Sequence, residues 1–171
     1  MIEIVRAVIT DAQLLEVIGK QAILESHGHS APKADMDAYV NKNYNADFFE
    51  ADISNSANIY HIMYYDKKPA GYSKIIFNYH HANVKQQHVT KLERLYVLEK
   101  FLDLKLGKEL FNFNLQLSKK NNQQGMWLFV WIENPRAIKF YLKNGFKIIG
   151  NHNFIISETH SNPNHVMFLQ Y

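Results

Sequence analysis

The chain has 171 residues, 47% of them hydrophobic, and no cysteine. This length and hydrophobic content suit one domain, residues 1–171, with a well-packed core. The absence of cysteine excludes disulfide bonds, a thiolate nucleophile and cysteine-based zinc sites. Because the formal net charge is only +3, we expect no nucleic-acid partner, although a local basic patch is compatible with this charge.

Two features argue against a membrane partner. Residues 1–6 lack the basic and then apolar layout of a secretion signal. The longest uninterrupted apolar run, Met126–Ile132, is too short to span a bilayer. We therefore expect no membrane partner and a cytoplasmic location.

The first part of the chain predicts a strand followed by three helices. Ile2–Val8 alternates like a strand, and Thr10 with Gln13 predicts a capping box for a long helix with one apolar face. Two short helices are expected at Met36–Tyr44 and Asn45–Ile53. Their aromatic residues are candidates for one wall of a substrate cleft, namely Tyr39, Tyr44, Phe48 and Phe49.

The middle of the chain predicts a hairpin and a central strand. Asn58–Tyr65 and Ala70–Asn78 are rich in β-forming residues, and the short polar link between them predicts antiparallel pairing. Tyr79–Thr90 is polar and rich in histidine, which favours a loop. A central strand is expected at Leu92–Val97, and a helix begins after the turn at Gly107.

The second half alternates strands and helices. Met126–Ile132 is apolar at every position, as expected of a strand that is buried on both faces. Asn134 followed by Pro135 is a strong helix start. Phe146–Gly150 and His165–Tyr171 are expected to form the last strands. This order predicts an α+β (mixed α/β) domain with a mixed sheet.

Residues 91–111 are expected to form the functional centre, since they read as a strand, a basic loop and the start of a helix. Such a loop directs unpaired backbone N–H groups toward one point at the positive end of a helix dipole, which favours an anion. Lys100, Lys105 and Lys108 crowd this helix start, where a bound phosphate would offset their repulsion by the dipole. The alternative is a solvated lysine cluster that serves solubility.

Two segments of the chain carry a resemblance to a known family. They are Glu93–Leu98 with the Gly107-Lys108 pair, and Trp131–Phe146 with its Phe-Tyr pair and Asn-Gly-Phe end. On these residues, and along the whole chain, the sequence resembles the GNAT superfamily of acetyl-CoA-dependent N-acetyltransferases, most closely the bacterial spermidine/spermine N-acetyltransferase branch. The resemblance implies a GNAT-type single domain whose central, largely antiparallel sheet of about seven strands is flanked by helices.

The resemblance also implies where acetyl-CoA binds. GNAT enzymes hold its pyrophosphate on a loop with the pattern Gln/Arg-x-x-Gly-x-Gly/Ala, but here Leu102 and Lys105 replace the first two of these residue types and only Gly107 keeps its type. The Cβ of Lys105 restricts the close approach of phosphate that glycine allows. The implied cofactor-binding residues are Leu95, Tyr96 and Val97 through their backbone, and Leu102, Asp103, Leu104, Lys105, Leu106, Gly107, Lys108, Asn134 and Arg136. Helix capping alone would also explain Asn134.

Acetyl transfer needs a base and an acid. The amine arrives as an ammonium ion, and Glu93 is the candidate that takes its proton directly or through water, with Glu133 as the second candidate. An ion pair of Glu93 with Arg94 or another basic residue is the structural alternative. The resemblance places the general acid at Tyr141, whose phenol can protonate the departing CoA thiolate. Packing on an apolar helix face would explain Tyr141 equally well.

No metal is expected as a cofactor. The candidate ligands lie in polar loops, and they are His27, His29, His80, His81 and His88. No carboxylates are spaced beside them to complete a ligand set. Loop solvation or contacts with substrate explain these histidines better.

The expected acceptor is a small-molecule primary amine, with a polyamine such as spermidine or spermine favoured. Asp47, Glu50 and Asp52 are candidates for an acidic cleft, although any solvated helix face looks the same. Three alternatives stay open. They are a protein or peptide N-acetyltransferase, a degenerate acyl-CoA-binding regulator without turnover, and a nucleic-acid binder that uses Lys119 and Lys120. The sequence also leaves a homodimer open.

Overall fold

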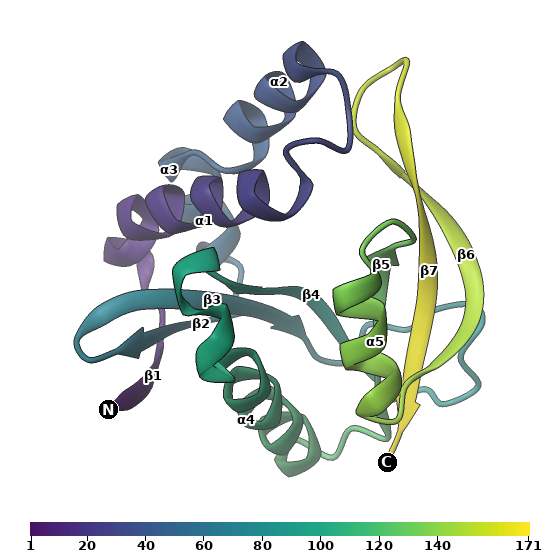
Figure 1. Cartoon of the computed structure of the whole chain (residues 1–171). Helices are drawn as coiled ribbons and strands as arrows, with labels where there is room; N and C mark the ends of the chain where they lie inside the picture. The colour runs from purple at the N-terminus through teal and green to yellow at the C-terminus, as the bar shows by residue number, and fades with distance from the viewer.

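The computed structural model describes the whole chain, Met1–Tyr171 (Figure 1). Its strands are β1 (Ile2–Arg6), β2 (Asn58–Tyr65), β3 (Lys68–Ile76), β4 (Thr90–Val97), β5 (Gly125–Trp131), β6 (Lys147–Ile155) and β7 (Ser161–Gln170). Its α-helices are α1 (Ala12–His27), α2 (Lys33–Asn43), α3 (Ala46–Ser54), α4 (Leu106–Lys120) and α5 (Pro135–Lys143). Two short 3-10 helices, η1 (Ile9–Asp11) and η2 (Glu99–Leu104), precede α1 and α4.

The seven strands form one sheet in the order β1-β2-β3-β4-β5-β7-β6. Every neighbouring pair is antiparallel except β4 and β5, which run parallel and are connected through α4. The sheet is therefore mixed and largely antiparallel. The predicted fold class is confirmed.

β4 and β5 separate soon after they begin. Their paired residues are Thr90 with Met126 and Lys91 with Trp127, and the pairing goes no further. β4 continues beside β3, whereas β5 continues beside β7. The sheet thus has two wings, β1–β4 and β5–β7, whose ribbons diverge toward the carboxyl ends of β4 and β5 (Figure 1).

Helices cover both faces of the β1–β4 wing. Figure 1 shows α1, α2 and α3 on one side of this wing and α4 on the other, with α5 beside β5 and β7. The largest buried cluster joins α1 and α3 to the sheet and includes Leu15, Phe49 and Tyr72. A second cluster, which includes Phe111 and Met126, joins α4 and α5 to β5. None of the helices combines the length and apolar character that crossing a bilayer requires.

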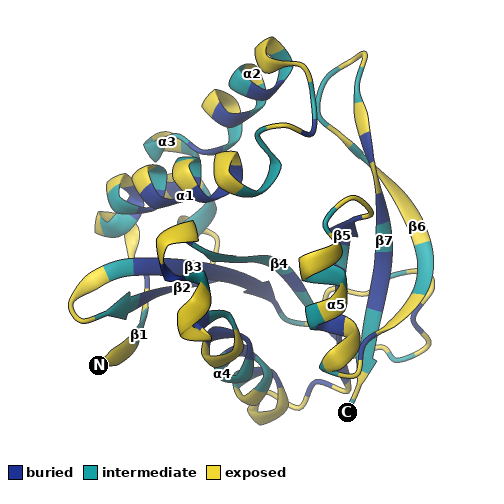
Figure 2. Cartoon of the chain, viewed as in Figure 1, coloured by how far each residue is buried: buried dark blue, intermediate teal, exposed yellow.

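Three of the expected strands have the predicted character. The β2–β3 hairpin has a tight turn in which Asp66 and Lys67 adopt φ values of 46° and 64°, as a type I′ turn requires. β5 is buried at most positions, as Figure 2 shows. Ile132, which the sequence assigns to this strand, lies just beyond its end and is exposed.

The predicted capping box of Thr10 and Gln13 is wrong. The chain instead makes the turn η1, in which the Asp11 carboxylate accepts a hydrogen bond from the backbone N–H of Val8 at 2.8 Å. Aspartate is short enough to reach back three residues. The helix α1 therefore starts after Asp11.

The last two strands are longer than predicted. Both β6 and β7 extend toward their shared turn, through residues such as His152, Asn153 and Asn162. These polar residues carry no strand signal of their own. They are in strands because the two segments pair with each other as a hairpin.

Candidate active site

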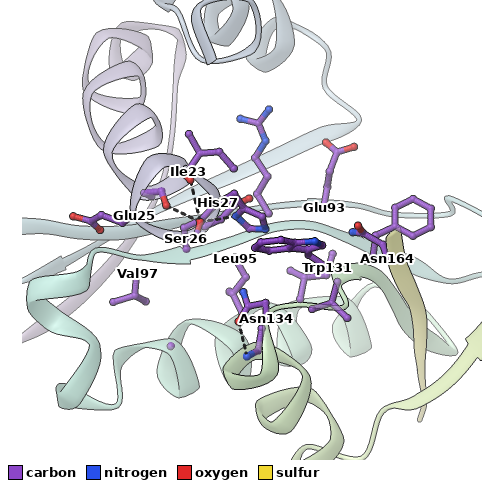
Figure 3. Close-up of a pocket in the computed structure, with 18 of the residues that line it drawn as sticks. Ile23, Glu25, Ser26, His27, Glu93, Leu95, Val97, Trp131, Asn134 and Asn164 are labelled. Carbon is purple, nitrogen blue, oxygen red and sulfur yellow. Dashed lines mark hydrogen bonds between the residues drawn. The ribbon is translucent and has the colours of Figure 1, made fainter. Parts of the chain in front are cut away.

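A cavity with a volume of about 960 Å³ lies where the two wings of the sheet part. β4 contributes seven consecutive lining residues, Lys91–Val97, and the rest come from both wings and from all five α-helices. Figure 3 shows His27 and Trp131 side by side in the cavity, with Glu93 and Asn134 on opposite sides of this pair. The cavity therefore has the divergence of β4 and β5 at its centre.

The backbone of β4 is available to a ligand. Beyond Lys91, the edge of β4 that faces β5 has no strand partner, and unpaired strand N–H and C=O groups readily bind a further chain or ligand. On its other edge β4 contains a bulge, because Leu92 and Arg94 pair with consecutive residues of β3 and Glu93 is the extra residue. Figure 3 shows Glu93 pointing to the opposite side of β4 from Leu95.

Glu93 is held between two lysines. One of its carboxylate oxygens pairs with Nζ of Lys74, which also lies 2.7 Å from an oxygen of Asp52. The other oxygen accepts a hydrogen bond from Nζ of Lys91 at 3.0 Å. Burial alone would raise the pKa of Glu93, but the two ammonium groups outweigh burial and hold this pKa below its usual value. The partners of Glu93 are thus lysines rather than Arg94.

Tyr141 lines the cavity from α5, at the boundary with the second core cluster. Its ring packs against Phe140 and Phe146, with centroid separations of 5.3 Å in both cases. Burial raises the pKa of Tyr141, so its phenol stays protonated at neutral pH and can donate a proton. The residue both packs and faces the cavity. Glu133, the second candidate base, is exposed and does not line the cavity.

The start of α4 reaches the cavity through Lys105, Gly107 and Lys108. Lys105 has φ 59° and ψ 15°, the left-handed conformation that favours glycine. The loop therefore adopts a conformation suited to glycine although its sequence has lysine. No side chain caps α4, so N–H groups of its first turn are free to bind an anion.

Gly107 is not required by the packing of the protein itself. A Cβ atom added at this position would meet only Cγ2 of Val97, at 3.9 Å, which is an ordinary contact. Its φ is not in the positive range that favours glycine. The open space above Gly107 therefore belongs to the cavity.

Three more of the predicted cofactor residues line the cavity, namely Leu102, Asn134 and Arg136. The side-chain oxygen of Asn134 accepts a hydrogen bond from the N–H of Ala137 at 3.1 Å and so caps α5. The guanidinium of Arg136 reaches the carbonyl oxygen of Leu102 at 3.5 Å, which connects η2 to α5.

The other three predicted cofactor residues of this loop do not contribute side chains to the cavity. Asp103 and Leu104 are exposed, because the 3-10 geometry of η2 turns them outward. Leu106 is fully buried in the largest core cluster. None of these three side chains therefore reaches a ligand inside the cavity.

The aromatic wall predicted from the early helices is present at the other end of the cavity. Tyr39, Tyr44 and Phe48 line it, while Phe49 is fully buried in the core. Phe154 of β6 extends the wall, with its ring centroid 6.1 Å from that of Tyr39. The wall thus joins the two wings of the molecule.

The acidic cleft predicted at this end is not formed. Asp47 and Glu50 are exposed, and neither they nor Asp52 lines the cavity. The carboxylate of Asp52 is occupied by Nζ of Lys74 at 2.7 Å and by the hydroxyl of Tyr60 at 2.5 Å. Asp47 and Glu50 lie instead on the solvent-exposed face of α3, which is the alternative to an acidic cleft.

Sequence reasoning did not identify His27 and Trp131 as cavity residues. Their ring centroids are 5.6 Å apart, and burial, with a smaller contribution from His29, lowers the pKa of His27 to about 4. His27 ends α1 rather than lying in a loop. Its spacing of four residues from Ile23 was the available signal, since it places both on one helix face.

The histidines do not converge on a metal site. In no place do three or more His, Asp or Glu side chains come together as a set of metal ligands. His27 and His29 instead pack against the ring of Trp131. Of the two, His27 lines the cavity and gives it aromatic surface, whereas His29 is exposed outside it.

Known proteins resemble this chain in sequence and in fold. Residues 21–146 match the family model for the acetyltransferase (GNAT) family. An uncharacterized N-acetyltransferase encoded in the pepI 3' region of Lactobacillus delbrueckii subsp. lactis is 24% identical over 141 residues, which cover 82% of each chain.

Solved structures share the whole architecture. The PaiA N-acetyltransferase of Thermoplasma acidophilum, solved in complex with coenzyme A, superimposes with a TM-score of 0.79 at 20% identity, covering 100% of this chain and 99% of the other. The ribosomal-protein-S18-alanine N-acetyltransferase of Escherichia coli gives a TM-score of 0.72 at 17% identity, with coverage of 99% and 94%. The family match covers most of the chain, and the seven-stranded sheet and its central cavity agree with it. The chain belongs to the acetyltransferase (GNAT) family, whose N-acetyltransferases take their acetyl group from acetyl-CoA.

Proposed function

We propose that the chain, acting as one domain over residues 1–171, transfers the acetyl group of acetyl-CoA to a primary amine by direct attack in a ternary complex. The main support for this proposal is that the free edge of β4, the uncapped start of α4 and the Tyr141 phenol all line one cavity. Free N–H groups suit a pyrophosphate and a polarised carbonyl oxygen, and the phenol suits a leaving thiolate.

In this proposal acetyl-CoA occupies the α4 end of the cavity. The backbone of Leu95, Tyr96 and Val97 would hold the pantetheine arm and polarise the thioester carbonyl group. The start of α4, with Lys105 and Gly107, would receive the pyrophosphate. Lys108, in the first turn of α4, would add positive charge there, and its ammonium group donates to the side chain of Asn144 at the end of α5.

Two side chains would move protons. The acceptor nitrogen loses a proton and attacks the thioester carbon, the carbon–sulfur bond breaks, and the departing thiolate takes the proton of Tyr141. Glu93 stays ionised at neutral pH because Lys74 and Lys91 hold its pKa low. It would therefore be present as a carboxylate that attracts the ammonium form of the acceptor, and in this proposal water carries the proton of the ammonium away past Glu93.

The acceptor is proposed as a small primary amine. A polyamine such as spermidine is the candidate that the sequence favours, and Glu93 is the carboxylate that supports it. Asp47 and Glu50 add nothing to that case, because they do not line the cavity. Protein and peptide amines are alternative acceptors, and the assay described below includes them. A homodimer stays a prediction, which light scattering on the purified protein would test.

The alternative is a regulator that binds acyl-CoA without turnover. The replacement of a glycine by Lys105 favours this alternative. The left-handed backbone at Lys105 shows that the loop reaches a glycine-like conformation despite this replacement. The backbone conformation of the loop therefore does not support the regulator, and only the Cβ atom of Lys105 does.

The deciding assay measures CoA release from acetyl-CoA with a panel of polyamines, small amines, amino acids and peptides, beside calorimetric binding of acetyl-CoA. We expect turnover with at least one amine. Tyr141→Phe is expected to lower kcat at least tenfold, since general acid catalysis commonly contributes more than that, while the acetyl-CoA dissociation constant stays within about twofold. Binding of acetyl-CoA without turnover on any acceptor would favour the regulator instead.

A further inference from the structure

Arg94 is a cation without an anionic partner, placed next to Glu93 on β4. It lines the cavity, and one terminal nitrogen of its guanidinium, Nη1, is buried without any hydrogen-bond partner. None of the ion pairs of the protein includes it. Tyr72 lies close enough for Arg94 to influence its pKa, yet the Tyr72 hydroxyl is itself without a hydrogen-bond partner of ordinary geometry.

The two neighbouring lysines, unlike Arg94, form ion pairs. Lys74 pairs with both Asp52 and Glu93, and Lys91 pairs with Glu93. On this side of β4, three cations thus face two carboxylates, and the uncompensated charge is that of Arg94. Leaving a buried guanidinium without an acceptor is costly for stability, so the arrangement is one that a bound anion would complete.

Aromatic rings fix the position of the free guanidinium. Its central carbon lies 4.4 Å from the ring centroid of Tyr44, 5.3 Å from that of Phe48 and 5.5 Å from that of Phe49. Such contacts hold the planar group in place and leave its N–H edge for other partners. Tyr44 and Phe48 also line the cavity, so this edge lies at the aromatic wall and not at the start of α4.

We propose that Arg94 binds a carboxylate of the acceptor, and that the acceptor is therefore an amino acid or a similar primary amine that bears a carboxylate and an apolar side chain. This inference rests on the proposed acetyl transfer at the same cavity. A guanidinium matches a carboxylate through two parallel hydrogen bonds, and this match is strongest away from water. The aromatic wall would receive the apolar side chain, and Glu93 would face the amine.

A polyamine fits this arrangement poorly. It carries several positive charges and no anionic group, so it would leave Arg94 unpaired and place further cations near it. An amino acid carries one charge of each sign. Its carboxylate would pair with the guanidinium of Arg94. Its ammonium group would pair with the carboxylate of Glu93, the residue next to Arg94 on β4.

The test compares amines that differ only in the carboxylate. CoA release is measured with phenylalanine and phenethylamine, tyrosine and tyramine, and lysine and cadaverine. In the wild type, kcat/KM for at least one amino acid is expected to exceed that of its decarboxylated partner at least tenfold. In Arg94→Met this ratio is expected to fall toward one, mainly through a higher KM for the amino acid.

Two further variants make the test selective. Arg6→Met removes an arginine of β1 whose side chain donates a hydrogen bond to the carbonyl of Asn58 and does not line the cavity, so it should leave the preference unchanged. Arg94→Lys keeps the charge but not the two-fold hydrogen bonding, so it should retain only part of the preference, and it replaces Arg94→Met if that variant does not fold.

The outcomes separate this inference from the proposed function. Release of CoA with equal efficiency from both members of every pair would leave the acetyltransferase intact and overturn the role of Arg94. If no amine released CoA, the proposed function would fail, and calorimetric titration with phenylalanine and phenethylamine would still decide the role of Arg94. Tighter binding of phenylalanine that Arg94→Met abolishes would support it, and equal or absent binding would overturn it.

Discussion

Gly107→Ala is expected to strengthen the fold and weaken the binding of acetyl-CoA. The added methyl group would meet only Cγ2 of Val97 at 3.9 Å, so it brings no clash within the protein. Alanine is favoured over glycine in a helix by about 0.5–1 kcal/mol. For a chain of this size, that gain corresponds to a rise in Tm of about 1–4 °C.

The opposite effect on binding follows from the position of Gly107 in the first turn of α4, at the cavity. A methyl group there would keep an anion away from the free N–H groups of the helix start. We expect the dissociation constant of acetyl-CoA to rise at least tenfold, equivalent to about 1.4 kcal/mol. Calorimetric titration with acetyl-CoA and thermal unfolding of the same preparation measure the two effects.

Gly19→Ala is the matched control in another helix. A Cβ atom at Gly19 would lie 3.1 Å from ring atoms of both Phe49 and Tyr44, which is too close for comfortable packing, so the helix gain should be lost and Tm should not rise. An unchanged acetyl-CoA affinity in Gly107→Ala, at raised Tm, would refute the assignment of this helix start to the cofactor. A lowered Tm would refute the claim that the fold tolerates a side chain there.

Two further predictions concern stability. Lys105→Gly is expected to be more stable than Lys105→Ala by about 1 kcal/mol, because residue 105 has φ 59° and only glycine adopts this value without steric cost; equal midpoints in urea would show that the residue is not left-handed. The second concerns His61, whose pKa is lowered from 6.5 to about 4 by burial and, to a smaller extent, by Arg6. The folded protein thus favours the neutral ring, so the free energy of unfolding should be highest above pH 6.5 and fall as the pH drops toward 4, by up to about 3 kcal/mol for this residue. His27 titrates over the same range, so His61→Gln should remove about half of the dependence of the unfolding free energy on pH. Urea unfolding at several pH values measures this dependence, and an unchanged dependence would contradict the lowered pKa of His61.

The elements of the fold were predictable where their signals are local. The β2–β3 hairpin follows from two β-rich runs and a short polar link, and α5 follows from Asn134 and Pro135. The strand–helix–strand order also predicts the parallel pair β4 and β5. Their early separation after Lys91 was not predictable, because no residue within either strand marks where pairing with a distant strand stops.

The site was predictable in its location but not in its charge balance. The sequence places Glu93 and Arg94 side by side, so an ion pair between them is a natural expectation. The bulge at Glu93 and the approach of Lys74 from the neighbouring strand instead give Glu93 its partners. Which cation remains free is decided by contacts between distant segments, and local sequence patterns do not reveal those contacts.

The two ends of the cavity are built by different means. At the aromatic wall, Asp52 of α3 pairs with Lys74 of β3, and Lys74 pairs with Glu93 of β4. This chain of charges ties the helix that carries Phe48 to the strand that carries Glu93 and Arg94, so the acceptor end is preorganised by side chains. At the start of α4 the predicted anion site consists mainly of backbone N–H groups, since no side chain caps the helix. Side-chain substitutions should therefore alter the choice of acceptor readily, whereas the binding of acetyl-CoA should respond most to changes that reshape the backbone or fill the space above it, as at Lys105 and Gly107.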